Sequence, residues 1–141
     1  MADPNVPYTI DFLQKIIQEH DDHVISYKLQ REEKMTSKYH EHSAVCKKTH
    51  GTLEKYVRKE ILNDFKSDYV LTDNNFPYYL EEGLGHKLLW TCKKMERESI
   101  EEIAKATFTG EFVWFENATV NKSLPGIYHY HIVFRIKKDV E

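Results

Sequence analysis

Two histidines near the end of the chain have the type and spacing that chemistry requires. His129 and His131 stand in a segment, residues 123–135, that opens with the turn signal Pro125-Gly126 and continues with alternating aromatic and β-branched residues. Successive side chains of a strand point to opposite faces, so the two imidazoles share one face about 7 Å apart. Such a pair can form half of a metal site or the centre of a phosphoryl-transfer site, or it can be two polar residues on the wet face of a sheet.

A second group of candidates lies in residues 74–90, a loop rich in aromatic, amide and carboxylate side chains that leads into an expected strand. His86 begins this strand and would meet His129 or His131 if the two strands pair. Glu81 or Glu82 could orient an imidazole or complete a metal site. A packed loop with a capping histidine explains the block equally well. The candidate ligand contacts in this block are Asn75, Tyr78, Glu81, His86 and Trp90.

A third group joins two expected strands. Residues 117–123 carry amide, hydroxyl and ammonium groups suited to gripping an anion, and ordinary turn composition explains them equally well. Asn117, Ser123 and, at the end of the last strand, Arg135 complete the set of candidate ligand contacts.

Other histidines and cysteines are expected to have structural roles instead of binding a metal or acting as nucleophiles. His42, Cys46 and His50 follow at helical spacing, but the first and last would lie about 12 Å apart at a rise of about 1.5 Å per residue. They are interpreted as surface histidines and a buried cysteine. Cys92 has no identifiable activating environment and is also expected to be buried.

Composition places the chain among ordinary globular domains. It has 141 residues, a net charge of −3 and two cysteines, too few for a disulfide framework. This charge gives no clear nucleic-acid footprint. No apolar run approaches a membrane span, and the first residues lack a signal peptide's pattern, so a cytoplasmic or nuclear location is expected. We expect one domain over 1–141, with a homo-oligomer left open.

The first 63 residues are predicted to be mainly helical. Thr9 precedes a helix that begins near Ile10. Asp21 and Asp22 offer caps for a second helix that carries Val24, Ile25 and Leu29 toward Cys46, with a break near Thr36-Ser37. Gly51 ends it, and Thr52 caps a third helix over 53–62.

Residues 69–137 are predicted to hold loops, strands and one helix. The stretch 71–79 is expected to be a loop, and Ser99 is expected to cap a helix through Ala104. The expected strands cover 87–92, 112–115 and 128–136. An α+β fold follows, with the N-terminal helices packed on a small antiparallel sheet formed by the C-terminal half, and with the helices on one face.

Three segments together resemble the fungal N-acetylglucosamine-induced protein family, whose biochemical function is unknown. They are residues 48–56, residues 75–90, and Asn117 followed by residues 123–125 and 129–131. The likeness covers residues 48–135 in segments, with departures at His50, where Tyr is usual, and at Gly85, where Glu or a similar residue is expected. It implies a shared fold and a shared pocket but no established reaction.

A weaker similarity is to the histidine-triad nucleotide hydrolases and transferases. Gly85-His86, Asn117, Ser123 and the pair His129 and His131 occur in the family's order. The similarity implies attack by an imidazole on the α-phosphorus of a nucleotide and a covalent intermediate. Positions 127 and 133 are Ile and Val where a third histidine would stand, so either His129 or His131 could be the nucleophile.

The favoured hypothesis is a pocket lined by His86, His129 and His131 that binds or processes a phosphorylated small molecule or nucleotide, with His129 and His131 as the catalytic candidates. One alternative is a metal-dependent enzyme in which the same three histidines hold a divalent cation. Another is a non-catalytic interaction or virion structural protein, in which the motif residues only stabilise the sheet. Whether the protein is an enzyme is left open.

Overall fold

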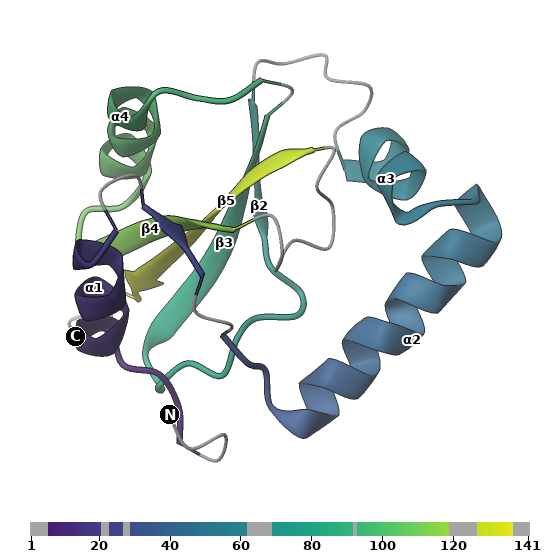
Figure 1. Cartoon of the computed structure of the whole chain (residues 1–141), viewed down its shortest axis with the longest axis horizontal. Coiled ribbons are helices and arrows are strands. Elements are labelled where there is room, and N and C mark those ends of the chain that lie inside the picture. Colours follow the sequence, from purple (N-terminus) through teal and green to yellow (C-terminus); the bar gives the residue numbers. More distant parts are fainter. Residues whose placement is uncertain are drawn as a thin grey trace, which may run out of the picture.

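The computed structural model describes residues 6–20, 23–26, 29–61, 69–91, 93–118 and 127–136. It has the predicted α+β fold, in which helices surround one five-stranded sheet (Figure 1). The elements in chain order are α1 (Ile10–Gln18), β1 (Val24–Ile25), α2 (Glu33–His50), α3 (Leu53–Tyr56), the π-helical turn η1 (Val57–Ile61), β2 (Tyr69–Asp73), β3 (Leu84–Thr91), α4 (Arg97–Thr107), β4 (Phe112–Asn117) and β5 (Tyr128–Arg135).

The histidine strand β5 is the centre of the sheet. The strand order is β1-β4-β5-β3-β2, and β5 pairs antiparallel with both β3 and β4. The three strands predicted from sequence therefore form the middle of the sheet. The edges were not predicted: β2 adds an antiparallel strand on one side, and β1 adds a parallel strand on the other.

Helices cover both faces of the sheet, which corrects the expectation that they lie on one face. Val113, Phe115 and Val133 point to the face on which α1 packs. Trp114 and Ile132 alternate with them and point to the opposite face, where Ile100 and Ala104 of α4 cover them. Because strand side chains alternate, both faces of these apolar strands need a cover, and α4 supplies the second.

The helices predicted to begin after Thr9 and after Thr52 are present, and both threonines cap them. The Thr9 hydroxyl accepts from the Phe12 amide at 3.1 Å, and the Thr52 hydroxyl accepts from the Lys55 amide at 3.1 Å. Gly51 ends α2 with a φ of 90°, a left-handed conformation that glycine adopts without the steric penalty of a side chain. Local capping chemistry was therefore readable from the sequence at these ends.

The predicted second helix begins too early. Val24 and Ile25 form β1, where Ile25 is fully buried. This strand pairs with β4, and next to it the Glu116 amide donates to the His23 carbonyl at 2.8 Å. Helix α2 starts only at Glu33 and then runs without a break through Thr36-Ser37. The proposed caps Asp21 and Asp22 lie outside the described residues.

Two further local predictions are corrected. Residues 71–73, predicted as part of a loop, end strand β2, where Leu71 pairs with Leu89. The turn-forming residues take effect only from Asn74 onward. Helix α4 begins at Arg97 with Glu96 at its N-cap, so Ser99 lies inside the first turn instead of capping it.

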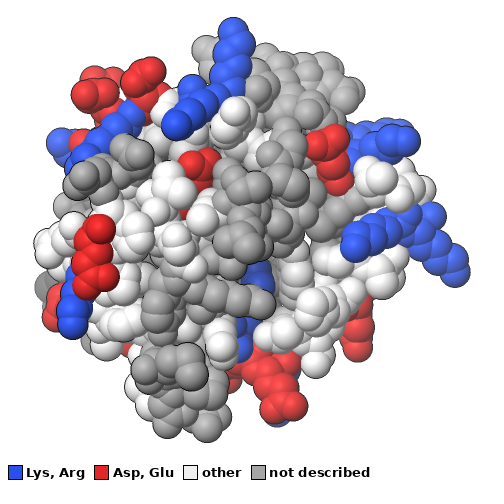
Figure 2. Space-filling model, in the orientation of Figure 1, with Lys and Arg blue, Asp and Glu red and all other residues white. Residues whose placement is uncertain are grey.

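Helix α2 projects from the sheet with little burial. Among its described residues only Ser43 and Cys46 are buried, and Figure 1 shows the helix at the far side of the molecule from α1 and α4. On the face drawn in Figure 2, acidic and basic side chains both occur around the rim. None of the described helices combines the length and the hydrophobicity that a membrane span requires.

Candidate functional site

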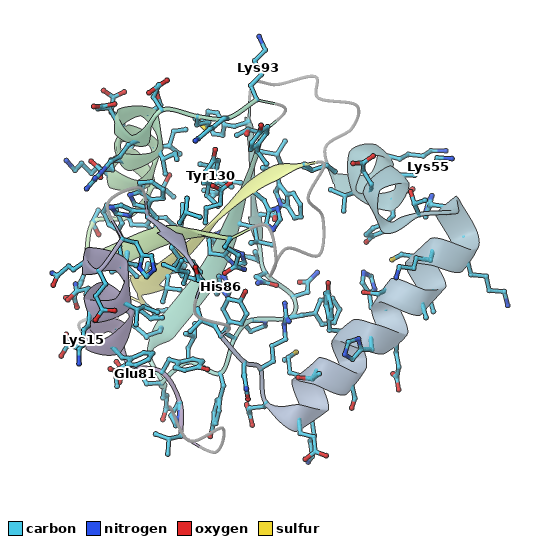
Figure 3. All side chains as sticks on the ribbon, viewed as in Figure 1. Lys15, Lys55, Glu81, His86, Lys93 and Tyr130 are labelled. Atoms are coloured by element: carbon cyan, nitrogen blue, oxygen red, sulfur yellow. The ribbon has the colours of Figure 1, made fainter. Side chains whose placement is uncertain are left out.

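Strand register brings the predicted histidines to one face of the sheet. His131 lies opposite Leu88 of β3 and Phe115 of β4, and His86 lies opposite Val133. His86 and His131 are therefore diagonal neighbours on this face, within reach of long side chains. Figure 3 shows His86 near the middle of the molecule.

Four side chains on this face form what we call the buried polar cluster: Tyr78, His86, Asn117 and His131, each less than a tenth exposed. The Nε2 atom of His86 lies 2.9 Å from the Nδ1 atom of His131. The Asn117 amide donates to the Tyr78 hydroxyl at 2.8 Å and lies 3.3 Å from the Nε2 atom of His131. A hydrogen-bonded chain thus runs from the β2–β3 loop through two imidazoles.

Backbone contacts from the N-terminal segments position the loop that carries Tyr78. The Tyr8 amide donates to the Tyr79 carbonyl at 2.7 Å, and the Glu81 amide donates to the Tyr8 carbonyl at 2.9 Å. On the other side, the Tyr79 amide donates to the Gln30 carbonyl at 2.9 Å. Residues far apart in the chain therefore hold Tyr78 over the sheet.

Aromatic packing fixes the rings of the cluster. The His131 ring lies 5.0 Å from the Phe115 ring at an interplanar angle of 5°, and 5.4 Å from the Tyr78 ring. Tyr78 also stacks on His86 at 5.2 Å. Offset stacking of this kind restricts ring rotation, so the imidazole nitrogens keep their directions.

Burial holds His86 in its neutral form. Desolvation, helped by the nearby Arg31 guanidinium, lowers the pKa of His86 to about 3. Burial likewise raises the pKa of Tyr78, against the smaller effects of the Asn117 hydrogen bond and Arg31, so its hydroxyl stays protonated. Arg31 itself lies against two aromatic rings, 4.3 Å from the Tyr39 ring centroid and 5.2 Å from that of Tyr78.

The hydrogen bonds define the tautomers of the two neutral imidazoles. Because the Asn117 amide nitrogen donates, His131 Nε2 accepts and His131 carries its proton on Nδ1. That proton is donated to His86 Nε2, so His86 carries its own proton on Nδ1. This assignment follows from the orientation of the Asn117 amide.

The Nδ1 side of His86 faces Asn74. The amide nitrogen of Asn74 lies 3.3 Å from His86 Nδ1 and 3.5 Å from Nε2, while its oxygen accepts from the Phe76 amide at 2.9 Å. Two donors, Asn74 Nδ2 and His86 Nδ1, thus lie close together. Both residues line a cleft of about 260 Å³, whose lining also includes loop residues 77–80 and Gly85.

The structure separates the other sequence candidates. Glu81 forms an ion pair with Arg135 at 3.8 Å and does not contact the histidines through any described hydrogen bond. Trp90 stacks on His129 at 5.2 Å and donates its indole N–H to Thr72 at 2.9 Å.

His129 is adjacent to the cluster but differently bonded. Its Nδ1 donates to the Ile127 carbonyl at 3.2 Å, and its ring centroid is 5.5 Å from that of His131. Asn75 is exposed at the bend before Phe76, and Ser123 lies outside the described residues.

Sequence reasoning missed three contributors. Phe115 could have been found, because strand alternation places it on the face of Asn117. Asn74 immediately precedes the predicted contact Asn75, and only its position after β2 distinguishes it. Arg31 carries no recognisable signal, since its role depends on the packing of Tyr39 and Tyr78. For the metal alternative, no three histidine, cysteine or acidic side chains converge on a possible ion position within the described ranges.

Comparison with known proteins identifies the class of this α+β domain. A family model described as "Protein of unknown function (DUF3605)" matches residues 10–135. The uncharacterized protein YPL067C of Saccharomyces cerevisiae is 27% identical, with 75% of this chain and 70% of that protein covered. The crystal structure of HTC1 has a TM-score of 0.61 and 23% identity, with 92% of this chain and 86% of that chain covered, and it supports the fold.

The chain therefore belongs to the DUF3605 family of proteins of unknown function. This confirms the resemblance to the N-acetylglucosamine-induced protein family. The similarity to histidine-triad hydrolases and transferases is not supported by these relatives. At the two flanking positions on the histidine face, Ile127 and Val133 are buried core residues.

Proposed function

We propose that the cleft beside His86 binds a phosphorylated small molecule or nucleotide, with one ligand oxygen accepting from His86 Nδ1 and Asn74 Nδ2. The observation that carries the proposal is the convergence of these two donors, 3.3 Å apart, in the cleft lining. With the His86 proton on Nδ1 both groups are donors, and a ligand oxygen within hydrogen-bond distance of both could accept from both.

Charge near the cluster favours an anionic ligand. Arg31 acts electrostatically on both His86 and Tyr78. A phosphate oxygen would gain from this positive charge more than a neutral acceptor, because a buried site screens charges weakly. Glu32 also lines the cleft, but it is exposed and its charge is screened by solvent.

The chemistry proposed for His86 is hydrogen-bond donation by a neutral imidazole. A ring whose pKa is about 3 stays uncharged near neutral pH, and it can still polarise a bound oxygen. The chain His86–His131–Asn117 fixes the donating tautomer, as a second layer of contacts does in many sites. This role differs from the nucleophilic role predicted for His129 or His131, and the proposal assigns no reaction step to His129.

The cleft volume limits the ligand. About 260 Å³ is slightly below the usual range for drug-sized molecules, about 300–1,000 Å³. A compact phosphorylated metabolite therefore fits better within the cleft than a dinucleotide. A nucleoside monophosphate would keep part of its structure outside.

Calorimetric titration with ribose 5-phosphate, AMP and inorganic phosphate tests the proposal. Asn74→Asp keeps the oxygen that accepts from the Phe76 amide but replaces the donor with a carboxylate oxygen. We expect Asn74→Asp to raise the Kd at least about tenfold, which corresponds to a loss of roughly 1.4 kcal/mol in binding free energy. Asn75→Asp places the same charge on the exposed neighbouring residue and should weaken binding far less.

Two results would contradict the proposal. One is the absence of saturable binding of all three probes to the folded wild-type protein. The other is a loss of affinity in Asn75→Asp that equals the loss in Asn74→Asp, because the effect would then come from charge alone.

A further inference from the structure

A larger cleft lies away from the buried polar cluster. It has a volume of about 650 Å³ and is lined by residues of α1, α4 and β4 together with His20 and His23. This volume falls within the usual range for ligand sites, about 300–1,000 Å³. In Figure 1, α1 and α4 flank the beginning of β4 on the same side of the molecule.

His23 has a strained backbone at the wall of this cleft. Its φ is 58°, and it is the one non-glycine residue with a positive φ in the described part of the chain. This left-handed conformation costs about 1–3 kcal/mol for such a residue and concentrates at functional sites. Here it places the imidazole on the Trp114 indole, with ring centroids 4.1 Å apart and an interplanar angle of 16°.

Backbone carbonyls orient both histidines of the cleft in the same way. His23 Nδ1 donates to the Trp114 carbonyl at 2.9 Å, and His20 Nδ1 donates to the Ile16 carbonyl at 2.7 Å. The carbonyls can only accept, so each Nδ1 carries a proton, and the two hydrogen bonds fix the orientation of both rings. Two imidazoles held by the backbone form a preorganised wall.

Helix α4 supplies the charges. Arg97, Glu101 and Lys105 follow at intervals of four residues and so share one helix face, which lines the cleft. Glu101 is already compensated: Arg97 Nε lies 3.2 Å from its carboxylate and the Trp114 indole N–H 3.5 Å. Lys105 adds a second cation, so this helix face has a net charge of +1 from two cations and one anion.

We infer that this cleft is a second ligand site, which takes a small molecule that joins a planar ring to a carboxylate or phosphate. The flat His23–Trp114 stack would pack against the ring, and the Lys105 ammonium would hold the oxyanion. The inference is independent of the function proposed for the smaller cleft, because the two clefts share no lining residue among those described.

Nitrogen–proton NMR of the whole protein gives a direct readout. The chain has two tryptophans, so the spectrum contains two indole N–H signals, which a Trp90→Phe variant assigns. Phenyl phosphate and benzoate should shift the Trp114 signal saturably and leave the Trp90 signal in place. A comparison of the affinities of these two probes shows whether the cleft prefers a phosphate or a carboxylate. Inorganic phosphate, which lacks the ring, should bind about tenfold more weakly.

Three variants make the test specific. His23→Gly removes the imidazole and suits the left-handed backbone, so the protein should fold while the ring-bearing anions bind about tenfold more weakly. Lys105→Gln should weaken binding about fivefold. Lys15→Gln makes the same charge change on the outer side of α1, where Figure 3 labels it, and should have no effect. No saturable Trp114 shift with either ring-bearing anion, or unchanged affinity in both His23→Gly and Lys105→Gln, would overturn the inference.

Discussion

The coupling between His86 and His131 is the most informative perturbation of the buried polar cluster. His131→Phe keeps a ring between Phe115 and Tyr78 but removes both ring nitrogens. The buried His86 nitrogen and the Asn117 amide each lose a partner, at 2.9 and 3.3 Å. A buried group left unsatisfied costs about 1–3 kcal/mol, and Asn117 keeps its bond to Tyr78, so we expect a loss of about 2–4 kcal/mol.

The second substitution should then cost less than it does alone. In the double variant His86→Phe/His131→Phe no imidazole is left without its partner. The stability loss of the double variant should therefore be smaller than the sum of the two single losses by about 1–3 kcal/mol. The free energy of unfolding is measured by urea denaturation at pH 7 for wild type, both single variants and the double variant, with the denaturant dependence checked for constancy.

A control pair separates this coupling from general destabilisation. Tyr130 is buried on the opposite face of the sheet, where its hydroxyl accepts from the Met95 amide at 3.0 Å. Tyr130→Phe combined with His86→Phe should be additive within about 0.5 kcal/mol. If the losses for His86 and His131 are additive to within the same limit as those of the control pair, the hydrogen bond between the two imidazoles is refuted.

Three further predictions concern the same fold. His86 has a folded-state pKa of about 3, below the unfolded value of 6.5, so the unfolded state binds more protons at acidic pH. The free energy of unfolding should therefore fall by about 1.4 kcal/mol per pH unit as the pH drops below 6.5. Urea denaturation at pH 7 and pH 5 should show this loss in wild type, and His86→Phe should lack the His86 contribution to it. Tyr78→Phe should cost about 1 kcal/mol in urea denaturation, because Asn117 loses its 2.8 Å acceptor; no loss would mean that this bond adds nothing. Gly85→Ala should cost about 1–3 kcal/mol in urea denaturation, because its Cβ would lie 2.4 Å from the Phe134 ring. Gly110→Ala, whose Cβ would lie 3.8 Å from its nearest atom, should be close to neutral in the same measurement.

The parts of the fold that were predictable from sequence depend on local chemistry or on strict alternation. The helix start after Thr9, the cap at Thr52 and the end of α2 at Gly51 are local, and they were predicted. Strand β1 was not, because two residues carry no periodicity of their own and Ile25 becomes a strand residue only through its pairing with β4. The covered second face of the sheet likewise depends on where α4 packs.

The candidate site divides in the same way. Strand pairing allowed the meeting of His86 with His131 to be anticipated, since both strands alternate regularly. Tyr78 and Asn117 were singled out by the composition of the loop and the turn that hold them, and the family resemblance includes both. The pairing of Glu81 with Arg135 could not be predicted, because it depends on the loop that Tyr8 and Gln30 hold in place. Gly85, a departure from the family pattern, is accounted for by the Phe134 ring that packs against it.

The most direct test of the proposed site is a long-range nitrogen–proton NMR spectrum of histidine-labelled protein at pH 6, recorded with and without ribose 5-phosphate. The account predicts that His86 and His131 are neutral, with protonated Nδ1 and unprotonated Nε2 atoms, and that the ligand shifts the Nδ1 signal of His86 most strongly. A charged His86 at this pH, a proton on its Nε2, or an Nδ1 signal that the ligand does not move would contradict it.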